Sequence, residues 1–442
     1  MATTYLTRTA SGTDGSNSQR KNTISMWLKR SSLSDACFIE GQGDDANATQ
    51  VYFDSNTKLT VNHVSGNSSL NFQIVTNRVF RDTSAWYHFV ITIDTTLGTA
   101  ADRVKIYVNG VRETSFSSAS YPGQNATTQL LARLNLNIIG RRKSGGVGLY
   151  FDGSMSHVHV TDGTAYQAST FGSTDSTTGE WKINTSPSVT YGNNGFTILK
   201  DGNTITDQSS NSNNFSLGGG TLTNTEDCPS NVFAILNAIT PSSNNNRAGG
   251  TRHFNNSGGY DMRHSTLAVT KGKYYAEFYI ADMTGGFTIV GIQDTSQFDD
   301  YNFMTNSSRG YGYRSDGTKG NNNSSSSFGN SFTSGDYIGV AVDLDNNKIY
   351  FSKNGVWQNS GDPTSGATGT GSAFDITDNY DYCIATSSND AGTDQITDVN
   401  FGNGYFNVTA VSSAGTNASG NGIFEYDVPT GYTALSTKGL NI

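Results

Sequence analysis

One stretch of the chain combines acidic and aromatic side chains of the kind that bind sugars. Asp299, Asp300 and Tyr301 are consecutive, and Tyr311 and Tyr313 follow shortly after them. In such sites an aromatic ring covers the apolar C–H face of a sugar, while carboxylates bind its hydroxyl groups. We predict that these five residues bind a ligand. For Tyr311 and Tyr313 the alternative is a packing role within a strand.

Two histidines and three cysteines could take part in metal chemistry. His157 and His159 are two residues apart and would share one face of a strand, a spacing that suits a pair of metal ligands. No third ligand accompanies them, so a solvent-facing or core role is the alternative. Cys37, Cys228 and Cys383 are far apart and form no C-x-x-C motif, which argues against structural zinc and against a disulfide framework.

The composition indicates many short strands rather than helices, membrane spans or a nucleic-acid surface. The 442 residues include 50 glycines, 22 tyrosines and 23 phenylalanines but only 6 prolines, and the length predicts two domains. The net charge of −9 disfavours nucleic acid as a partner. We expect no membrane insertion, because no apolar run approaches the length of a span, and no signal peptide at the start.

The sequence contains two similar hairpin patterns, one in each half. Residues 86–94 alternate apolar and polar side chains, and a second strand at 104–108 ends in Asn109-Gly110. The same order occurs at 337–353, which ends in Asn354-Gly355. Alternation with period two predicts strands that are buried on one face, and Asn-Gly favours the type I′ turn of a β-hairpin.

The motifs around these hairpins resemble two known β-sandwich families. In the first 165 residues the motifs are ISMWLKR (24–30), WYHFVITID (86–94), VKIYVNGV (104–111) and NIIGRRKSGGVGLYFDGSMSHVHVTDG (137–163). They resemble laminin-G-like jelly rolls of the concanavalin-A-like lectin and glucanase group. The later motifs are GKYYAEFYI (272–280), VGIQD (290–294), GYGYRSDG (310–317), SGDYIGVAVDLDNNKIYFSKNGVW (334–357) and VNFG (399–402). They resemble a SPRY domain.

The resemblance implies an all-β fold of two antiparallel β-sandwiches joined by a packed extended segment. We place a laminin-G-like jelly roll at 1–165, a connecting segment with short strands at 166–250, and a SPRY-like sandwich with a C-terminal tail at 251–442. Apolar residues between Phe424 and Leu435 predict a closing strand and an anchored tail. In both families, recognition uses loops at one end of the sheets.

The same resemblance raises the question of hydrolysis and of calcium. Glucanases of this fold place two acids at alternating positions of one strand, and hydrolysis requires two closely spaced carboxyl groups. None of the six glutamates has another two or four residues away, and Asp343 and Asp345 flank a turn. We therefore predict no catalytic residue and no enzyme. Calcium is possible near Asp44, Asp45 and Asn47, but these residues also suit an ordinary turn, and no cofactor or metal is assigned.

The middle segment and the C-terminal end resemble structural proteins of tailed bacteriophages, particularly marine ones. The segments concerned are YFDGSMSHVHVTDGTAYQASTFGSTDSTTGEW (150–181), DQSSNSNNF (207–215) and FEYDVPTGYTALSTKGLN (424–441). The resemblance implies a virion protein made in the host bacterial cytoplasm, namely a tail fibre or appendage that binds a bacterial surface glycan or receptor. The alternative is a capsid-decorating or tail-assembly protein that binds other virion proteins. A homo-oligomer, possibly a trimer, is also implied, although no heptad repeat supports it.

Overall fold

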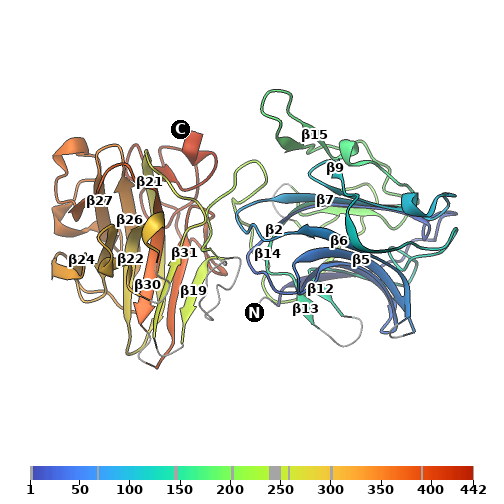
Figure 1. Ribbon diagram of the computed structural model, residues 1–442, viewed down its shortest axis with the longest axis horizontal. Coiled ribbons are helices and arrows are strands. Elements are labelled where there is room, and N and C mark those ends of the chain that lie inside the picture. The colour runs from blue at the N-terminus through green and yellow to red at the C-terminus, as the bar shows by residue number, and fades with distance from the viewer. Residues whose placement is uncertain are drawn as a thin grey trace. The chain divides into compact units, whose positions relative to one another are not determined.

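The computed structural model (Figure 1) confirms the all-β prediction. It describes residues 3–66, 69–143, 148–200, 204–237, 250–256, 259–298, 302–389 and 392–441. Within these ranges every helical turn is a three-residue 3-10 turn, and none is long and apolar enough to cross a membrane. The chain divides into two units, Met1–Asn224 and Thr225–Ile442, which are described separately.

The first unit is a sandwich of an eight-stranded and a six-stranded antiparallel sheet. The larger sheet has the order β10 (Phe116–Ser120), β6 (Ser69–Val79), β5 (Lys58–Ser65), β4 (Asn47–Phe53), β3 (Ala36–Asp44), β11 (Leu136–Ile139), β1 (Tyr5–Thr9), β18 (Ser216–Gly219). The smaller has the order β17 (Phe196–Ile198), β14 (Gly153–Asp162), β2 (Lys21–Arg30), β7 (Tyr87–Asp94), β8 (Val104–Val108), β9 (Val111–Arg112). Two short pairs are added, β12 (Arg141–Arg142) with β13 (Leu149–Tyr150) and β15 (Gly172–Thr174) with β16 (Trp181–Ile183). The 3-10 turns are η1 (Ala100–Asp102) and η3 (Ala168–Thr170).

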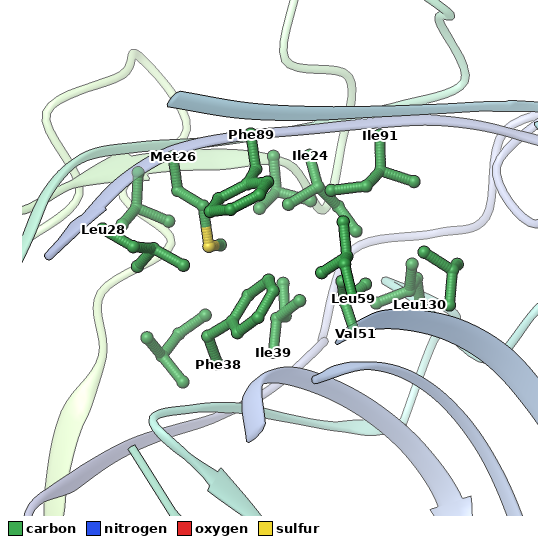
Figure 2. Close-up of a cluster of buried hydrophobic side chains, with 14 of the residues drawn as sticks. Ile24, Met26, Leu28, Phe38, Ile39, Val51, Leu59, Phe89, Ile91 and Leu130 are labelled. Atoms are coloured by element: carbon green, nitrogen blue, oxygen red, sulfur yellow. The ribbon is translucent and has the colours of Figure 1, made fainter. Parts of the chain in front are cut away.

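The core of the first unit lies between its two sheets. Figure 2 shows Met26 and Phe89 pointing toward Phe38 and Ile39 of the opposite sheet. All four side chains are at most 1% exposed. Alternate residues of β2 and β7 supply this layer, whereas in β3 a bulge between Cys37 and Ile39 lets the consecutive Phe38 and Ile39 both join it.

The second unit is also a sandwich of two sheets. One has the order β19 (Arg252–Asn255), β31 (Gln395–Asn400), β21 (Lys273–Met283), β26 (Tyr337–Asp343), β27 (Lys348–Lys353), β28 (Val356–Trp357), and it also includes β29 (Phe374–Asp375) and β34 (Thr433–Ala434). The other has the order β20 (Tyr260–His264), β30 (Tyr382–Asn389), β22 (Phe287–Asp294), β23 (Gly310–Arg314), β24 (Thr318–Asn321), β25 (Ser324–Ser327). A short pair joins β32 (Tyr405–Phe406) to β33 (Thr409–Ala410). The 3-10 turns are η4 (Thr295–Gln297), η5 (Met304–Asn306), η6 (Gln358–Ser360), η7 (Gly366–Thr368) and η8 (Gly439–Asn441).

The two predicted Asn-Gly turns have the same geometry and the same hydrogen bonds. Asn109 and Gly110 have φ values of 47° and 79°, and Asn354 and Gly355 have values of 50° and 78°. Two consecutive residues with positive φ form the type I′ turn that the sequence predicts. In each copy the asparagine side chain also accepts a hydrogen bond from the neighbouring strand, at 2.7 Å in the first and 2.8 Å in the second. The turn therefore holds three strands together.

The sheets that carry these turns are covered on their outer faces as well. The prediction of burial on one face only is wrong for β7, because Val90, which points away from the main core, is fully buried. Ala168 and Phe171 pack over it and over Tyr107. We call residues 166–191 the first covering segment. Its side chains form a second apolar layer on the outer face of β7, which we expected to contact water.

The C-terminal tail covers the corresponding face in the second unit. Phe424, Val428 and Tyr432 pack over Tyr275 and over neighbouring residues of β26 and β27. The tail is anchored, as the sequence predicts, and β34 runs parallel to β21. We call residues 421–436 the second covering segment.

The segment predicted to connect the domains is shared between the two units. Residues 166–224 belong to the first, where β17 pairs with β14 and β18 with β1. Residues 225–250 belong to the second, where the described residues Ala234 and Leu236 join the core. The extended pieces expected there are thus parts of the sandwiches.

Each Asn-Gly turn touches a ring of a covering segment. A Cβ atom added to Gly110 would lie 2.3 Å from the ring of Trp181, and one added to Gly355 would lie 2.5 Å from the ring of Tyr426. Glycine is therefore required at each turn for two reasons. It tolerates the positive φ, and it has no side chain in the space that the ring occupies.

This double requirement predicts the effect of alanine at the turn. Gly335 also has a positive φ, of 90°, but an added Cβ would meet nothing within 4 Å. Gly335→Ala should therefore cost only the backbone strain, about 1–2 kcal/mol of unfolding free energy. Gly355→Ala should cost about 1–3 kcal/mol more, because the alanine methyl displaces Tyr426. Urea unfolding of both variants gives the comparison, and equal losses would contradict the contact.

Candidate binding surface

The structure describes two of the five residues that the sequence predicts as a ligand site. Asp299, Asp300 and Tyr301 lie outside the described residues. Tyr311 and Tyr313, on β23, are 4% and 0% exposed and belong to the core of the second unit. Their side chains have the packing role that the sequence left as the alternative, so these two rings are not available to stack on a surface ligand.

The side chains of Tyr311 and Tyr313 also use their hydroxyl groups inside the unit. Tyr311 shares a hydrogen bond of 2.9 Å with the hydroxyl of Thr377, and Tyr313 donates to the carbonyl of Asn330. Burial raises the pKa of Tyr313 far above its usual value. Both hydroxyl groups are therefore engaged within the protein.

The described residues on either side of positions 299–301 pack against the six-stranded sheet. The Phe298 ring stacks on His264 with ring centroids 3.7 Å apart, and burial lowers the pKa of His264 to about 4. Phe303 contacts Tyr260 edge to face at 4.8 Å and Phe287 at 5.7 Å. The predicted segment therefore has an aromatic anchor at each end.

These contacts form a partly exposed aromatic cluster, which we define as Tyr260, Phe287, Phe303 and Arg314. Tyr260 is 45% exposed, and its one aromatic neighbour among the described residues is Phe303. The guanidinium of Arg314 lies 4.5 Å from the centre of the Phe287 ring. A surface with exposed ring faces beside a cation can bind planar or sugar-like groups through stacking and hydrogen bonds.

Buried charges fix the strand that carries Tyr260. On the inward side of β20, Asp261 binds His253 at 3.0 Å and Arg263 at 2.6 Å, and all three side chains are at most 1% exposed. Polar residues therefore occupy the inward positions of this strand, and the apolar Met262 lies on its outward face, where it is buried with Ile289 and Met304. This inversion is why the sequence analysis missed Tyr260. The spacing of two residues between Tyr260 and Met262, which places both on one face of the strand, was the signal that could have revealed Tyr260.

The predicted histidine pair belongs to the layer beneath the first covering segment. His159 is 2% exposed and shares a hydrogen bond of 2.8 Å with the hydroxyl of Tyr191. A bulge interrupts β14 after Ser156, where His157 has a positive φ of 48°, and the two histidine rings are 6.5 Å apart. Among the described residues, no group of three or more metal-ligating side chains comes together.

His88 on the neighbouring strand β7 has a similar role. Its Nδ1 accepts a hydrogen bond of 2.9 Å from the indole of Trp181, and its Nε2 bonds Ser25 at 2.9 Å. Burial lowers the pKa values of both His88 and His159 to about 3. Two neutral imidazoles thus help to hold the covering segment on the sheet.

The acidic loop considered for calcium forms a self-contained turn. Asp44 accepts hydrogen bonds of 2.8 Å from the backbone amide of Ala46 and from the side chain of Asn47. Asp45 accepts one of 2.9 Å from Gln42. These bonds are the turn chemistry that the sequence gave as the alternative.

Comparison with protein families agrees with this architecture. Residues 3–169 match the concanavalin A-like lectin/glucanases superfamily. Residues 273–374 match the SPRY domain. The chain thus contains one domain of each kind, both of which occur widely as binding folds.

Individual relatives cover parts of the chain only. An ATP-dependent RNA helicase DDX1 of Xenopus laevis is 37% identical over 91 residues, which are 21% of this chain and 12% of that relative's length. The SPRY domain of human HERC1 is 25% identical, with a TM-score of 0.27, and covers 34% of this chain and 87% of that structure. A heptameric SAP-like pentraxin from Limulus polyphemus is 17% identical, with a TM-score of 0.28, and covers 38% and 72%.

The lowered histidine pKa values predict that acid destabilises the first unit. An unfolded histidine has a pKa near 6.5, so below that pH the unfolded state takes up protons that the folded state refuses until about pH 3. The contribution of these neutral histidines to folding stability is therefore complete above pH 6.5, and it is lost progressively as the pH falls below that value. His159→Phe should reduce the loss between pH 7 and pH 5 by about 2 kcal/mol.

Tryptophan fluorescence can follow this transition during urea unfolding, because Trp27, Trp86 and Trp181 all lie in the first unit. His264→Phe, in the second unit, is the matched control and should leave the pH dependence of the first unit unchanged. An unaltered pH dependence in His159→Phe would contradict the assignment.

Proposed function

We propose that this protein is a non-enzymatic adhesin on an appendage of a tailed-phage virion, where it binds a glycan or receptor of the host cell surface. The observation that carries the binding role is the exposed ring of Tyr260 beside Phe303, in the unit that contains the SPRY match. In this proposal Asp299, Asp300 and Tyr301, which the chain places between Phe298 and Phe303, also contact the ligand. The virion setting is supported by the resemblance of residues 150–181, 207–215 and 424–441 to phage structural proteins.

The structural use of the acidic residues supports binding rather than hydrolysis. Glu277 is fully buried and accepts hydrogen bonds of 2.8 Å from the backbone amides of Glu425 and Tyr426. Asp343 is also fully buried, and it binds Lys273 at 2.9 Å and the side chain of Asn346 at 2.8 Å. A general acid or base must reach the scissile bond, and these carboxylates are occupied within the fold.

The aromatic cluster has the chemistry of a weak, multivalent surface contact. One exposed ring with polar neighbours gives a shallow site, and an appendage with several copies of such a site would gain strength through avidity. A homo-oligomer such as a trimer is therefore part of the proposal.

Replacing the exposed ring tests the proposal directly. Tyr260→Ala should lower adsorption of the protein to host cells at least tenfold, because the exposed ring supplies the stacking surface. Its unfolding free energy should change little, since about half of the side chain already contacts water. Binding of the labelled protein to intact cells, measured across concentrations, gives the result.

Tyr380→Ala is the matched control, because Tyr380 is 37% exposed in the same unit but stacks on Arg309 instead. It should leave adsorption unchanged. If the unaltered protein binds no host material and antibody labelling places it on the capsid, the protein is a decoration or assembly protein instead.

A further inference from the structure

One terminal strand of the second unit has a free edge made only of serine. β25 consists of Ser324–Ser327, and all four residues are exposed. It pairs with β24 on one side, and no strand among the described residues pairs with its other side. Figure 1 shows β24 on the side of this sheet away from β30. A free edge presents unpaired backbone N–H and C=O groups to which another strand can bind.

A tight turn sets the hydrogen-bonding pattern of the β24–β25 hairpin. Asn322 and Asn323 have φ values of 50° and 59°, and they connect the paired residues Asn321 and Ser324. Two consecutive residues with positive φ form a two-residue turn of type I′. The pair that closes such a turn exchanges both of its backbone hydrogen bonds, so Asn321 and Ser324 form a hydrogen-bonded pair.

Alternation along the hairpin leaves two serines with outward-facing backbone groups. Hydrogen-bonded residues of an antiparallel strand are two apart, so Ser326 is the next residue that bonds to β24. The amide of Phe328 continues the series, because it donates to the carbonyl of Gly317 at 3.2 Å. The N–H and C=O groups of Ser325 and Ser327 therefore point away from β24, toward the free edge.

Contacts at both ends hold this hairpin in place. At the turn, the backbone amide of Asn322 donates to the carbonyl of Ser307 at 3.0 Å. At the other end, the ring of Phe328 packs edge to face on Tyr313, with ring centroids 5.5 Å apart. A strand that is already fixed loses little conformational entropy when a partner binds, so β25 is preorganised for pairing.

The other terminal strands of the four large sheets carry features that hinder edge pairing. The pairings of β10 and β18 contain register shifts, and β9 and β28 have two residues each. The far side of β17 is occupied, because the amide of Gln208 donates to the carbonyl of Thr197 at 2.8 Å. β19 and β20 include charged residues such as Arg252 and Asp261. Short, bulged and charged edges discourage strand addition, whereas β25 is uncharged and has a regular register.

We infer that β25 pairs antiparallel with β25 of a second copy of this chain, with the two-fold axis at Ser326. Ser325 of each copy then lies opposite Ser327 of the other, and both residues of each pair present outward-facing backbone groups. Such pairs exchange both of their hydrogen bonds. The contact uses the same residues on both sides, so it closes after two copies. The inference goes beyond the proposed function and does not rest on it.

Charge favours a second copy at this edge. Each chain has a net charge of −9, so two copies repel each other where acidic surfaces meet. Residues 321–328, which form the turn and β25, contain no charged side chain. Two such edges can approach without placing like charges opposite one another, and facing serine hydroxyls can share hydrogen bonds. The contact is small, so we expect a weak dimer.

Sedimentation velocity of the full chain, from about 5 µM to about 500 µM, measures this association. The unaltered protein should change from monomer to dimer as its concentration rises. The double variant Ser325→Glu/Ser327→Glu should raise the dissociation constant at least tenfold, because like charges then face each other across the axis. Ser325→Lys/Ser327→Lys should do the same. An equimolar mixture of the two double variants should associate again, since each glutamate then faces a lysine.

The first unit offers a matched control for the charge variants. Ser118 and Ser120 are exposed serines on the terminal strand β10. Ser118→Glu/Ser120→Glu adds the same charge at another sheet edge and should leave the association unchanged. Thermal unfolding shows whether each variant is folded.

Disulfide cross-linking tests the register. Two Ser326 residues at the axis form a non-hydrogen-bonded pair with Cα atoms about 4.5 Å apart, which a disulfide can bridge. Ser326→Cys should therefore give a covalent dimer when copper phenanthroline oxidises it. Ser324→Cys, two residues from the axis, should not. Cys228, the one native cysteine that is partly exposed, is present in both variants and sets the background.

A chain that stays monomeric at every concentration overturns the inference, and the free edge would then suit an extended segment of another protein. Association that is unaffected by both β25 charge variants, or that is lost in the β10 variant, also overturns it. So does a mixture of the two β25 variants that fails to associate. Cross-linking through Ser324→Cys but not through Ser326→Cys would contradict the two-fold axis at Ser326.

Discussion

The central strands of each sandwich carry apolar side chains on both faces, and the second face must be covered. In the first unit Val90 and Tyr107 point away from the core, and in the second unit Tyr275 and Tyr350 do the same. Exposing such rings and branched chains to water is unfavourable. Each unit covers this face with a segment of its own, residues 166–191 in the first unit and residues 421–436 in the second.

Specific polar contacts hold the covering segments in place. Trp181 donates its indole N–H to His88 in the first unit, and Glu277 accepts two backbone amides of the tail in the second. These groups are buried, and burial lowers the pKa of His88 to about 3 and raises that of Glu277 to about 7. A buried layer without water tolerates polar groups that are neutral or that make all of their hydrogen bonds. The layer therefore fixes both the position and the protonation of His88 and Glu277.

The covering also decides which faces can bind. In the second unit the sheet opposite the covered one carries Tyr260, whose ring remains 45% exposed.

The sequence predicted the hairpins well, because alternation and Asn-Gly turns are local signals. Residues such as Phe89 and Ile349 are buried as their spacing indicates, and both turns have the expected positive φ values. Contacts between distant segments left no such signal. The contact of Trp181 with Gly110 depends on pairing that only the folded chain reveals. The same is true of the register that aligns Asn62 with Gln50 and Gln73. Tyr311 and Tyr313 show the reverse case, since residue types suited to a ligand site serve the core.

Hydrogen–deuterium exchange of the full chain, with and without purified host surface polysaccharide, tests the central claim most directly. The account predicts slower exchange in β20 and in the described residues around Phe303, while β2, β7, β14 and residues 421–436 remain unchanged. Slower exchange confined to the covered sheets, with none in β20 or around Phe303, would contradict it.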